Sequence, residues 1–422
     1  MHVITAKFKL YFLLLIFPAI ILVLLTCGCD KKQDNKQEKK EEKKSTPVYD
    51  KPLADFQYKL LDTAFETATL IPVKPLIKDR SKAQEAVVET ALELGQPKKA
   101  YGYIEKIDDW RRGSAYASLA YYYAENGADA NHFQQYMDSA NKIASEEGLE
   151  DWRRDTIKVK IAQVYALIND AKQAAKFQEG IVDSEKGKVV GVASMAGSEE
   201  SFNEQMNVLD ELIASQNFDI VKNALESGAQ LFNAYYTNLE KRTLIEEKIK
   251  NSWKPLPIFI RGQVLMKMAE FALEHADKTK AIELVNESQA LLSKDHGLTE
   301  DYVSTMAKLS RLRFLAGDVQ KAYEDVNSVI AVYDAQKMQI IDVYRAGVLR
   351  PLAQAYMSMG DKAAALAIYK RAIEEGAGNP NSRPRAEDLS ATCCSMVLSG
   401  LEPDAQLWTR ILQIKNGLNN PW

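Results

Sequence analysis

The chain has 422 residues, of which 46% are hydrophobic and 27% are charged, so its composition fits neither a disordered protein nor one with many membrane spans. Its 54 Lys and Arg residues against 58 Asp and Glu residues give a net charge of −4, and no segment is basic enough to predict nucleic-acid binding. Four Cys and four His, scattered along the chain, predict neither a disulfide scaffold nor a metal site.

The first segment predicts export from the cytoplasm. Residues 10–28 are uncharged and follow a short cationic stretch, which is typical of a secretion signal. The run ends in Cys27-Gly28-Cys29, which resembles the lipobox of bacterial lipoproteins, where a small residue precedes a Cys that is lipidated after cleavage. The resemblance favours Cys29, with Cys27 as the alternative. It implies a protein of the bacterial cell envelope, exported and held to a membrane by an N-terminal lipid, whereas the other interpretation is an uncleaved single membrane anchor.

The next segment predicts a spacer. Residues 30–46 contain no apolar side chain, so residues 29–50 are interpreted as the lipidated Cys and a charged, disordered tether. Residues 51–79, with two prolines near their end, predict a leading helix and a linker, placed as a cap on the open end of the array that follows.

From about residue 80 onward the apolar period is close to 3.6, which predicts an all-α body. A turn residue is followed five positions later by Ala in six units, and a seventh unit has His132 in the Ala place. The pairs are Gly95/Ala100, Gly127/His132, Asn169/Ala174, Ala276/Ala281, Gly317/Ala322, Gly360/Ala365 and Gly400/Ala405. A large residue stands eight positions before each turn and mostly a small one seven before, as in Leu352-Ala353, which predicts hairpins of closely packed helices.

The best copy of this pattern has Leu352-Ala353, Tyr356, Gly360, Ala365 and Tyr369, and it resembles a tetratricopeptide repeat. Spacings between turns are mostly longer than the 34 residues of that family. The resemblance implies a right-handed superhelical solenoid of antiparallel helix pairs. We expect N-terminal repeats over 80–186, a degenerate repeat and irregular connection over 187–257, and C-terminal repeats over 258–422.

The degenerate repeat is predicted from two apolar stretches. Helices are expected around Phe202–Ser215 and Phe218–Glu240, with a turn at Gln216-Asn217 between them. The two prolines in the segment from Trp253 to Pro257 predict a break before the next repeat.

An Arg recurs fifteen positions before the turn, at the expected start of each first helix. Its six members are Arg80, Arg112, Arg154, Arg261, Arg345 and Arg385. We favour a structural interpretation, in which the guanidinium stacks on an aromatic ring or bonds the carbonyls that end the preceding helix. The alternative is a ladder that binds an anionic ligand.

The sequence contains no catalytic motif that would identify an enzyme, and it predicts no cofactor. Cys393-Cys394 allows a redox interpretation, but Cys393 stands where other units have a small residue, so a buried thiol is favoured. A non-enzymatic protein is therefore expected.

Positions six and ten before each turn are expected to line the inner face of the array. The candidate partner-binding residues there are Tyr121, Gln163, Arg311, Arg350 and Gln354. The sequence thus predicts a lipid-anchored scaffold or assembly factor that binds a protein or peptide. The first alternative is a carbohydrate-binding lipoprotein, disfavoured by only five Trp residues. The second is an enzyme with helices closed into an α/α ring, which would place the unit at Gly400 against the leading helix.

Overall fold

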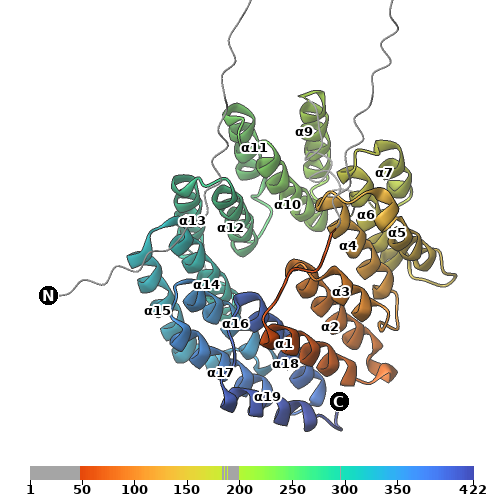
Figure 1. Ribbon diagram of the computed structural model, residues 1–422. Helices are drawn as coiled ribbons and strands as arrows, with labels where there is room; N and C mark the ends of the chain where they lie inside the picture. Colours follow the sequence, from red (N-terminus) through yellow and green to blue (C-terminus); the bar gives the residue numbers. More distant parts are fainter. Residues whose placement is uncertain (1–47, 183–184, 186–187, 189–198, 295) are drawn as a thin grey trace, which may run out of the picture. The chain divides into compact units, whose positions relative to one another are not determined.

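The computed structural model describes residues 48–182, 185, 188, 199–294 and 296–422. The chain divides into two units, Met1–Lys44 and Ser45–Trp422, and all the described residues belong to the second. The predicted signal segment, Cys27, Cys29 and most of the tether therefore lie outside the described residues. Within those ranges all regular structure is helical (Figure 1), and none of these helices is long and apolar enough to cross a membrane.

The helices follow one another as antiparallel pairs. Their bounds are α1 Asp55–Leu70, α2 Val73–Glu93, α3 Pro97–Ile104, α4 Arg111–Glu125, α5 Ala130–Ala144, α6 Asp151–Leu167, α7 Ala171–Gln178, α9 Glu199–Ala214, α10 Phe218–Ala234, α11 Leu239–Ser252, α12 Ile258–Glu274, α13 Lys278–Leu292, α14 Thr299–Ala316, α15 Val319–Gln336, α16 Asp342–Ser358, α17 Lys362–Ala377, α18 Ser382–Ser399 and α19 Ala405–Asn416. We call α2, α4, α6, α10, α12, α14, α16 and α18 the first helices. Each first helix packs on the helix that follows it in the chain, which we call its second helix. From α2 to α6, and from α10 to α18, each first helix also packs on the next first helix.

The predicted turn residues all adopt the left-handed backbone conformation. Their φ angles are +72° at Gly95, +74° at Gly127, +62° at Asn169, +58° at Ala276, +100° at Gly317, +82° at Gly360 and +68° at Gly400. A single left-handed residue ends a helix and reverses the chain, which is why Gly and Asn recur there. The predicted positions of the hairpins are thereby confirmed.

The two positions before each turn that were predicted to pack between helices are fully buried in every unit. The large position holds Val87, Leu119, Ile161, Met268, Leu309, Leu352 and Thr392, and the next holds Val88, Ala120, Ala162, Ala269, Ser310, Ala353 and Cys393, all 0% exposed. The helix register derived from the repeats is confirmed.

Two of the predicted second-helix residues are wrong. His132 is exposed and Phe133 is buried, because the extra connecting residue Ala128 makes Asp129 the N-cap of α5. Ala405 is exposed as the first residue of α19, because the N-cap Asp404 stands four residues after Gly400 whereas Asp361 directly follows Gly360, and Leu407 is buried instead.

The degenerate repeat contains the predicted helix pair and one helix more. Helices α9 and α10 lie close to the expected ranges and pack on each other, and Gln216 between them has the left-handed φ of +54°. However, α10 packs on both α11 and α12, so α10 is a first helix with α11 as its partner. The sequence reading missed α11, whose end at Ser252 agrees with the predicted break. Residues 189–198 of this connection lie outside the described residues.

The expectation of an open N-terminal end is wrong, because α1 packs against α18. The Gln57 amide donates to the Val397 carbonyl oxygen at 3.2 Å, and the Lys59 amine lies 4.3 Å from the centre of the Trp408 ring. Helix α18, which also packs on α2, buries twelve of its residues and so lacks the polar outer face of a terminal repeat. Helix α1 therefore joins the last repeat to the first.

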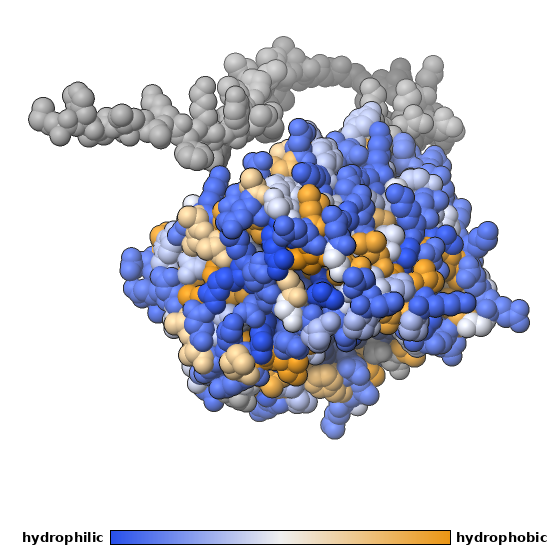
Figure 2. Space-filling view, turned by 90° about the horizontal axis from the view of Figure 1, so that it is seen from below, coloured by the Kyte–Doolittle hydropathy of each residue, from blue (hydrophilic) through white to orange (hydrophobic). Residues whose placement is uncertain are grey.

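Figure 2 shows a largely hydrophilic face on which hydrophobic side chains gather in small groups.

Ala276 offers a test of the turn geometry. An L-residue in the left-handed region costs roughly 1–2 kcal/mol, so Ala276→Gly is expected to stabilise the fold by about 1 kcal/mol. Gly360→Ala is the matched control, since a methyl group there would meet no atom within 4 Å and only the backbone cost of about 1 kcal/mol applies. Urea unfolding followed by circular dichroism should shift in opposite directions for the two variants. A shift in the same direction would contradict the turn assignment.

Candidate functional site

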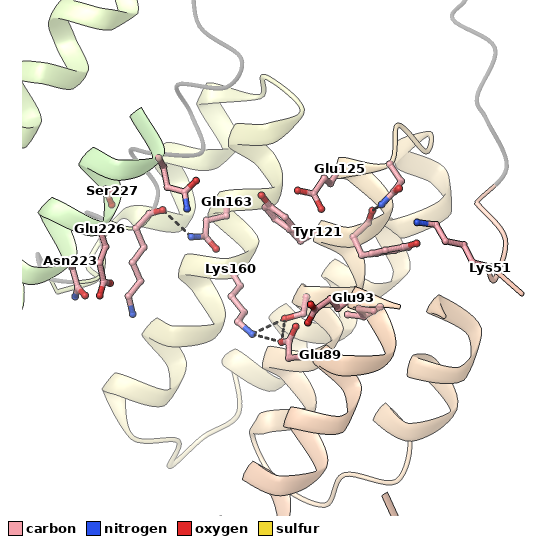
Figure 3. A pocket seen from close by; sticks show the side chains of 16 residues that line it. Lys51, Glu89, Glu93, Tyr121, Glu125, Lys160, Gln163, Asn223, Glu226 and Ser227 are labelled. Atoms are coloured by element: carbon pink, nitrogen blue, oxygen red, sulfur yellow. Dashed lines mark hydrogen bonds and ion pairs between the residues drawn. The ribbon is translucent and has the colours of Figure 1, made fainter. Parts of the chain in front are cut away.

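A cavity of about 810 Å³ lies between the first helices α2, α4, α6 and α10, and we call it the main cavity (Figure 3). Its wall is polar and mixed in charge. It includes the carboxylates Glu89, Glu93, Glu125 and Glu226, the amines Lys51, Lys160 and Lys188, and the rings of Tyr121 and Tyr122. Such a wall offers donors, acceptors and aromatic surface to one ligand.

A hydrogen-bonded cluster on α2, α4 and α6 stabilises one side of the main cavity. The Lys160 amine donates to Ser118 Oγ at 2.7 Å and to Glu89 Oε1 at 3.2 Å, and Ser118 Oγ donates to the same Glu89 oxygen at 2.7 Å. Lys160 also lies 3.8 Å from Glu85 Oε1. Three successive first helices are therefore linked by one amine, which holds this side of the cavity in a defined geometry.

Two carboxylates of the main cavity stand where a helix disfavours them. Glu93 and Glu125 are the last residues of α2 and α4, where the helix dipole is negative. Partial burial of the carboxyl groups raises the pKa of both Glu93 and Glu125. At Glu93 the charge of Arg311 lowers the pKa again in part. A cationic group entering the cavity would relieve both unfavourable effects.

Tyr121 and Tyr122 lie beside Glu125. Burial, and then the charge of Glu125, raise the pKa of Tyr121 to about 12. The pKa of Tyr122 is raised by burial and then by the charges of Asp50 and Glu125. Both phenols therefore stay protonated at neutral pH and remain hydrogen-bond donors.

The opposite side of the main cavity comes from α10. Asn223, Glu226, Ser227 and Gln230 line it there, facing the residues of α4 and α6 (Figure 3). On the α6 side the Gln163 amide donates to the Lys188 carbonyl oxygen at 2.9 Å. The cavity is thus bounded by residues from both sides of the segment that links α7 to α9.

A second cavity, of about 350 Å³, is lined by α2, α14, α16 and α18. Arg350 lies on its wall and pairs with Asp388 at 3.3 Å. Pro351 lies inside α16 and has no backbone N–H, so the Gly347 carbonyl oxygen lacks its usual helical hydrogen bond. Both residues line this cavity. The second cavity therefore has a mixed wall, in which Arg350 and Glu387 lie beside apolar residues such as Leu398.

The five predicted partner-binding residues divide between these places. Tyr121 and Gln163 line the main cavity, and Arg350 and Gln354 line the second one. Arg311 donates to Ser358 Oγ at 3.0 Å, and its charge acts on Glu93 of the main cavity. The sequence reading missed Glu93, Glu125 and the α10 residues. Glu93 and Glu125 each stand two positions before a turn residue, Gly95 and Gly127, and this shared position is the sequence signal that could have identified both.

The recurring Arg residues lie at the starts of first helices and mostly contact the preceding chain. Arg80 donates to the Ile71 carbonyl, Arg261 to those of Lys254 and Leu256, Arg345 to those of Lys337 and Ile340, and Arg385 to that of Asn381. Arg154 instead pairs with Asp151 at 2.8 Å and Asp155 at 3.2 Å, and Arg112 is half-buried. The contacts of Arg80, Arg261 and Arg345 tie a first helix to the chain before it, whereas those of Arg154 and Arg385 stay within their own helix and its N-cap.

Stacking on tryptophan involves the neighbouring arginines rather than those of the recurring set. The guanidinium carbon of Arg111 lies 4.7 Å from the Trp110 ring centre, and that of Arg153 lies 5.2 Å from the Trp152 ring centre. The two tryptophans meet edge to face with centres 5.3 Å apart. This cluster joins the starts of α4 and α6.

Cys393 and Cys394 are free thiols, which disagrees with a disulfide between them. Burial raises the pKa of Cys394 to about 11 and raises that of Cys393 further, so neither is a thiolate at neutral pH. Among the described residues no group of three or more His, Cys, Asp or Glu side chains is arranged to hold a metal ion.

No family model matches the chain, and no curated protein matches it. One solved structure with detectable similarity is a circular tandem repeat protein with novel repeat topology and enhanced subunit contact surfaces. It is 15% identical, with a TM-score of 0.27, and the match covers 86% of this chain and 94% of that chain. The described helices themselves define the class, an all-α protein of tandem helical repeats.

Proposed function

We propose that this chain is a lipid-anchored helical-repeat protein of the bacterial cell envelope, and that it binds a protein or peptide partner as a scaffold or assembly factor. The resemblance of Cys27-Gly28-Cys29 to a lipobox and the uncharged run before it support the anchor. The polar segment that follows supports a body held away from the lipid surface.

The observation that carries the binding role is the main cavity. Side-chain amides, carboxylates, amines and phenols line it together, and an extended polypeptide needs such a mixture because its backbone offers donors and acceptors at every residue. Glu93 and Glu125 favour a segment with a Lys or Arg side chain. Cavities on two sides of α2 give the partner a surface of more than one repeat.

The ring-enzyme alternative gains support from one contact, that of α1 with α18, which this alternative requires. Glu93 and Glu125 would then be the candidates for acid and base.

The carbohydrate-binding alternative needs an open aromatic surface. Tyr116, Tyr123 and Tyr136 instead stack on one another, with centres 6.4 Å apart for Tyr116 and Tyr136 and 5.8 Å for Tyr123 and Tyr136. Trp152 is 52% exposed, with the Arg153 guanidinium over one face of its ring and Trp110 packed edge to face against it. These rings therefore favour a role in helix packing.

The anchor is tested by replacing both Cys27 and Cys29 with Ser. We expect the double variant to lose lipid while the body stays folded, since neither Cys lies in the repeats. Metabolic labelling with a radioactive fatty acid measures the first effect, and circular dichroism measures the second. Each single variant identifies which Cys is modified. Continued labelling of the double variant would refute the lipid anchor.

Partner binding is tested by photo-crosslinking in intact cells. A benzoylphenylalanine at Tyr121, in the main cavity, is expected to form a discrete cross-linked product with another protein. The matched control places the same probe at the exposed Gln135 of α5, a second helix, and should form no such product. The absence of a product at Tyr121, or the same product from both positions, would contradict binding in the cavity.

A further inference from the structure

Residues Tyr49–Leu53, which we call the strap, lie along the turn between α2 and α3. The Lys51 backbone N–H donates to the Gly95 carbonyl oxygen at 2.9 Å, and the Lys98 backbone N–H donates to Asp50 Oδ1 at 2.9 Å. The Gln96 side-chain amide donates to the Lys51 carbonyl oxygen. Three hydrogen bonds therefore hold the first half of the strap to one turn.

The strap also borders the main cavity. Lys51 lines the cavity together with Tyr122 and Asn126, and Figure 3 places Lys51 on the same side as Glu125. A methyl group on Gly95 would lie only 2.6 Å from Lys51 Cδ, so the Lys51 stem rests directly on the turn. The strap is thus part of the wall at the ends of α2 and α4.

The two ends of the strap are held by different forces. Leu53 is partly buried and packs against the main hydrophobic core, just before α1 begins. At the other end Tyr49 is 67% exposed, and Lys51 and Pro52 are exposed as well. Two of the three hydrogen bonds end on Gly95 and Gln96, which are buried beneath the strap. Water can replace a hydrogen bond when a segment lifts, whereas it cannot replace the apolar contact of Leu53. Leu53 is therefore the more firmly held end of the strap.

We propose that the strap is a movable wall of the main cavity, which docks on the α2–α3 turn to narrow the cavity and swings away about Leu53 to open it. What enters the cavity rests on the proposed function. The movement itself does not, and it is tested without any partner.

The test uses the full-length chain with Tyr122→Cys, which places a cysteine in the main cavity. The rate at which this cysteine reacts with a maleimide is measured by mass spectrometry of the peptide that contains position 122. Asp50→Ala combined with Lys51→Pro removes two of the three hydrogen bonds. We expect this pair to raise the reaction rate about tenfold, equivalent to about 1.4 kcal/mol of docking free energy. The native Cys393 and Cys394 are buried and lie in another peptide.

Two controls separate strap release from general loosening. Asp50→Asn alone keeps the Oδ1 acceptor for Lys98 and should leave the rate unchanged. A reference cysteine at Gln135, on the outside of α5, should react equally fast with and without the strap changes. An unchanged rate at position 122 in the Asp50→Ala, Lys51→Pro protein would overturn the proposal, and so would an equal rise at position 135.

Discussion

Replacement of Arg313 by Ala is expected to lower the free energy of unfolding by about 3–5 kcal/mol, because it removes one partner from a buried ion pair. Arg313 is 3% exposed, and its guanidinium lies 2.8 Å from Asp318 Oδ2 and 3.0 Å from Asp325 Oδ2. It also donates to Asn286 Oδ1 at 2.6 Å. Without it the buried carboxylate of Asp325 keeps only the half-exposed Lys321 amine, 3.0 Å from its Oδ1 atom, as a cationic partner. Urea unfolding followed by circular dichroism measures the loss.

Arg311→Ala is the matched control, since Arg311 is exposed two residues earlier on the same helix and should change stability by less than about 0.5 kcal/mol. The double replacement Arg313→Met with Asp325→Leu removes both buried charges together and should recover most of the lost stability. Equal effects of Arg311→Ala and Arg313→Ala would show that the buried pair contributes little.

This buried pair was visible in the sequence as an exception to the repeat. Arg313 stands four positions before its turn, where other units have Tyr, Ala or Met, and Asp325 stands at a second-helix position that is buried. A repeat places its core by position, so a charge at a core position predicts a compensating charge close by. Two exceptions within one unit therefore indicate a contact.

The turns and the close helix packing were predictable because they depend on local rules. A left-handed residue is needed to end each first helix, and a small residue seven positions earlier is needed for the approach of the second. Where the connection length changes, as after Gly127 and Gly400, the same counting fails, because one or more extra residues shift the start of the second helix.

The contact between α1 and α18 was not predictable by counting. The hydrogen bond from Gln57 to Val397 joins residues 340 positions apart, and no repeat pattern encodes such a pair. The available signal was the composition of α18, whose residues Cys393, Met396 and Val397 leave little polar surface for an exposed end. Joining the ends also decides which residues of α2 face the second cavity.

The candidate site was predicted only where counting along the repeats applies. Tyr121 and Gln163 follow from the register of the first helices, which the buried positions confirm. The α10 side was missed because inner positions were counted only for the seven clear repeats, and the degenerate unit that contains α10 was left out of that count. Lys51 was missed because it precedes the repeats and reaches the cavity only through the hydrogen bonds of the strap.

The last prediction concerns Ala353, the small residue of the best-matched repeat. Ala353→Leu is expected to cost about 1–3 kcal/mol, because the added carbons must enter a core that is already full. Ala353 is 0% exposed on α16 and belongs to the same buried cluster as Leu352, Ala365 and Tyr369. Gln354→Leu, one residue later, places the same leucine on the partly exposed wall of the second cavity, where no added carbon has to enter the core, and should change stability by less than about 0.5 kcal/mol. The two urea midpoints should therefore separate clearly, and equal midpoints would mean that the helices of this hairpin have room to move apart without loss, which their packing here does not allow.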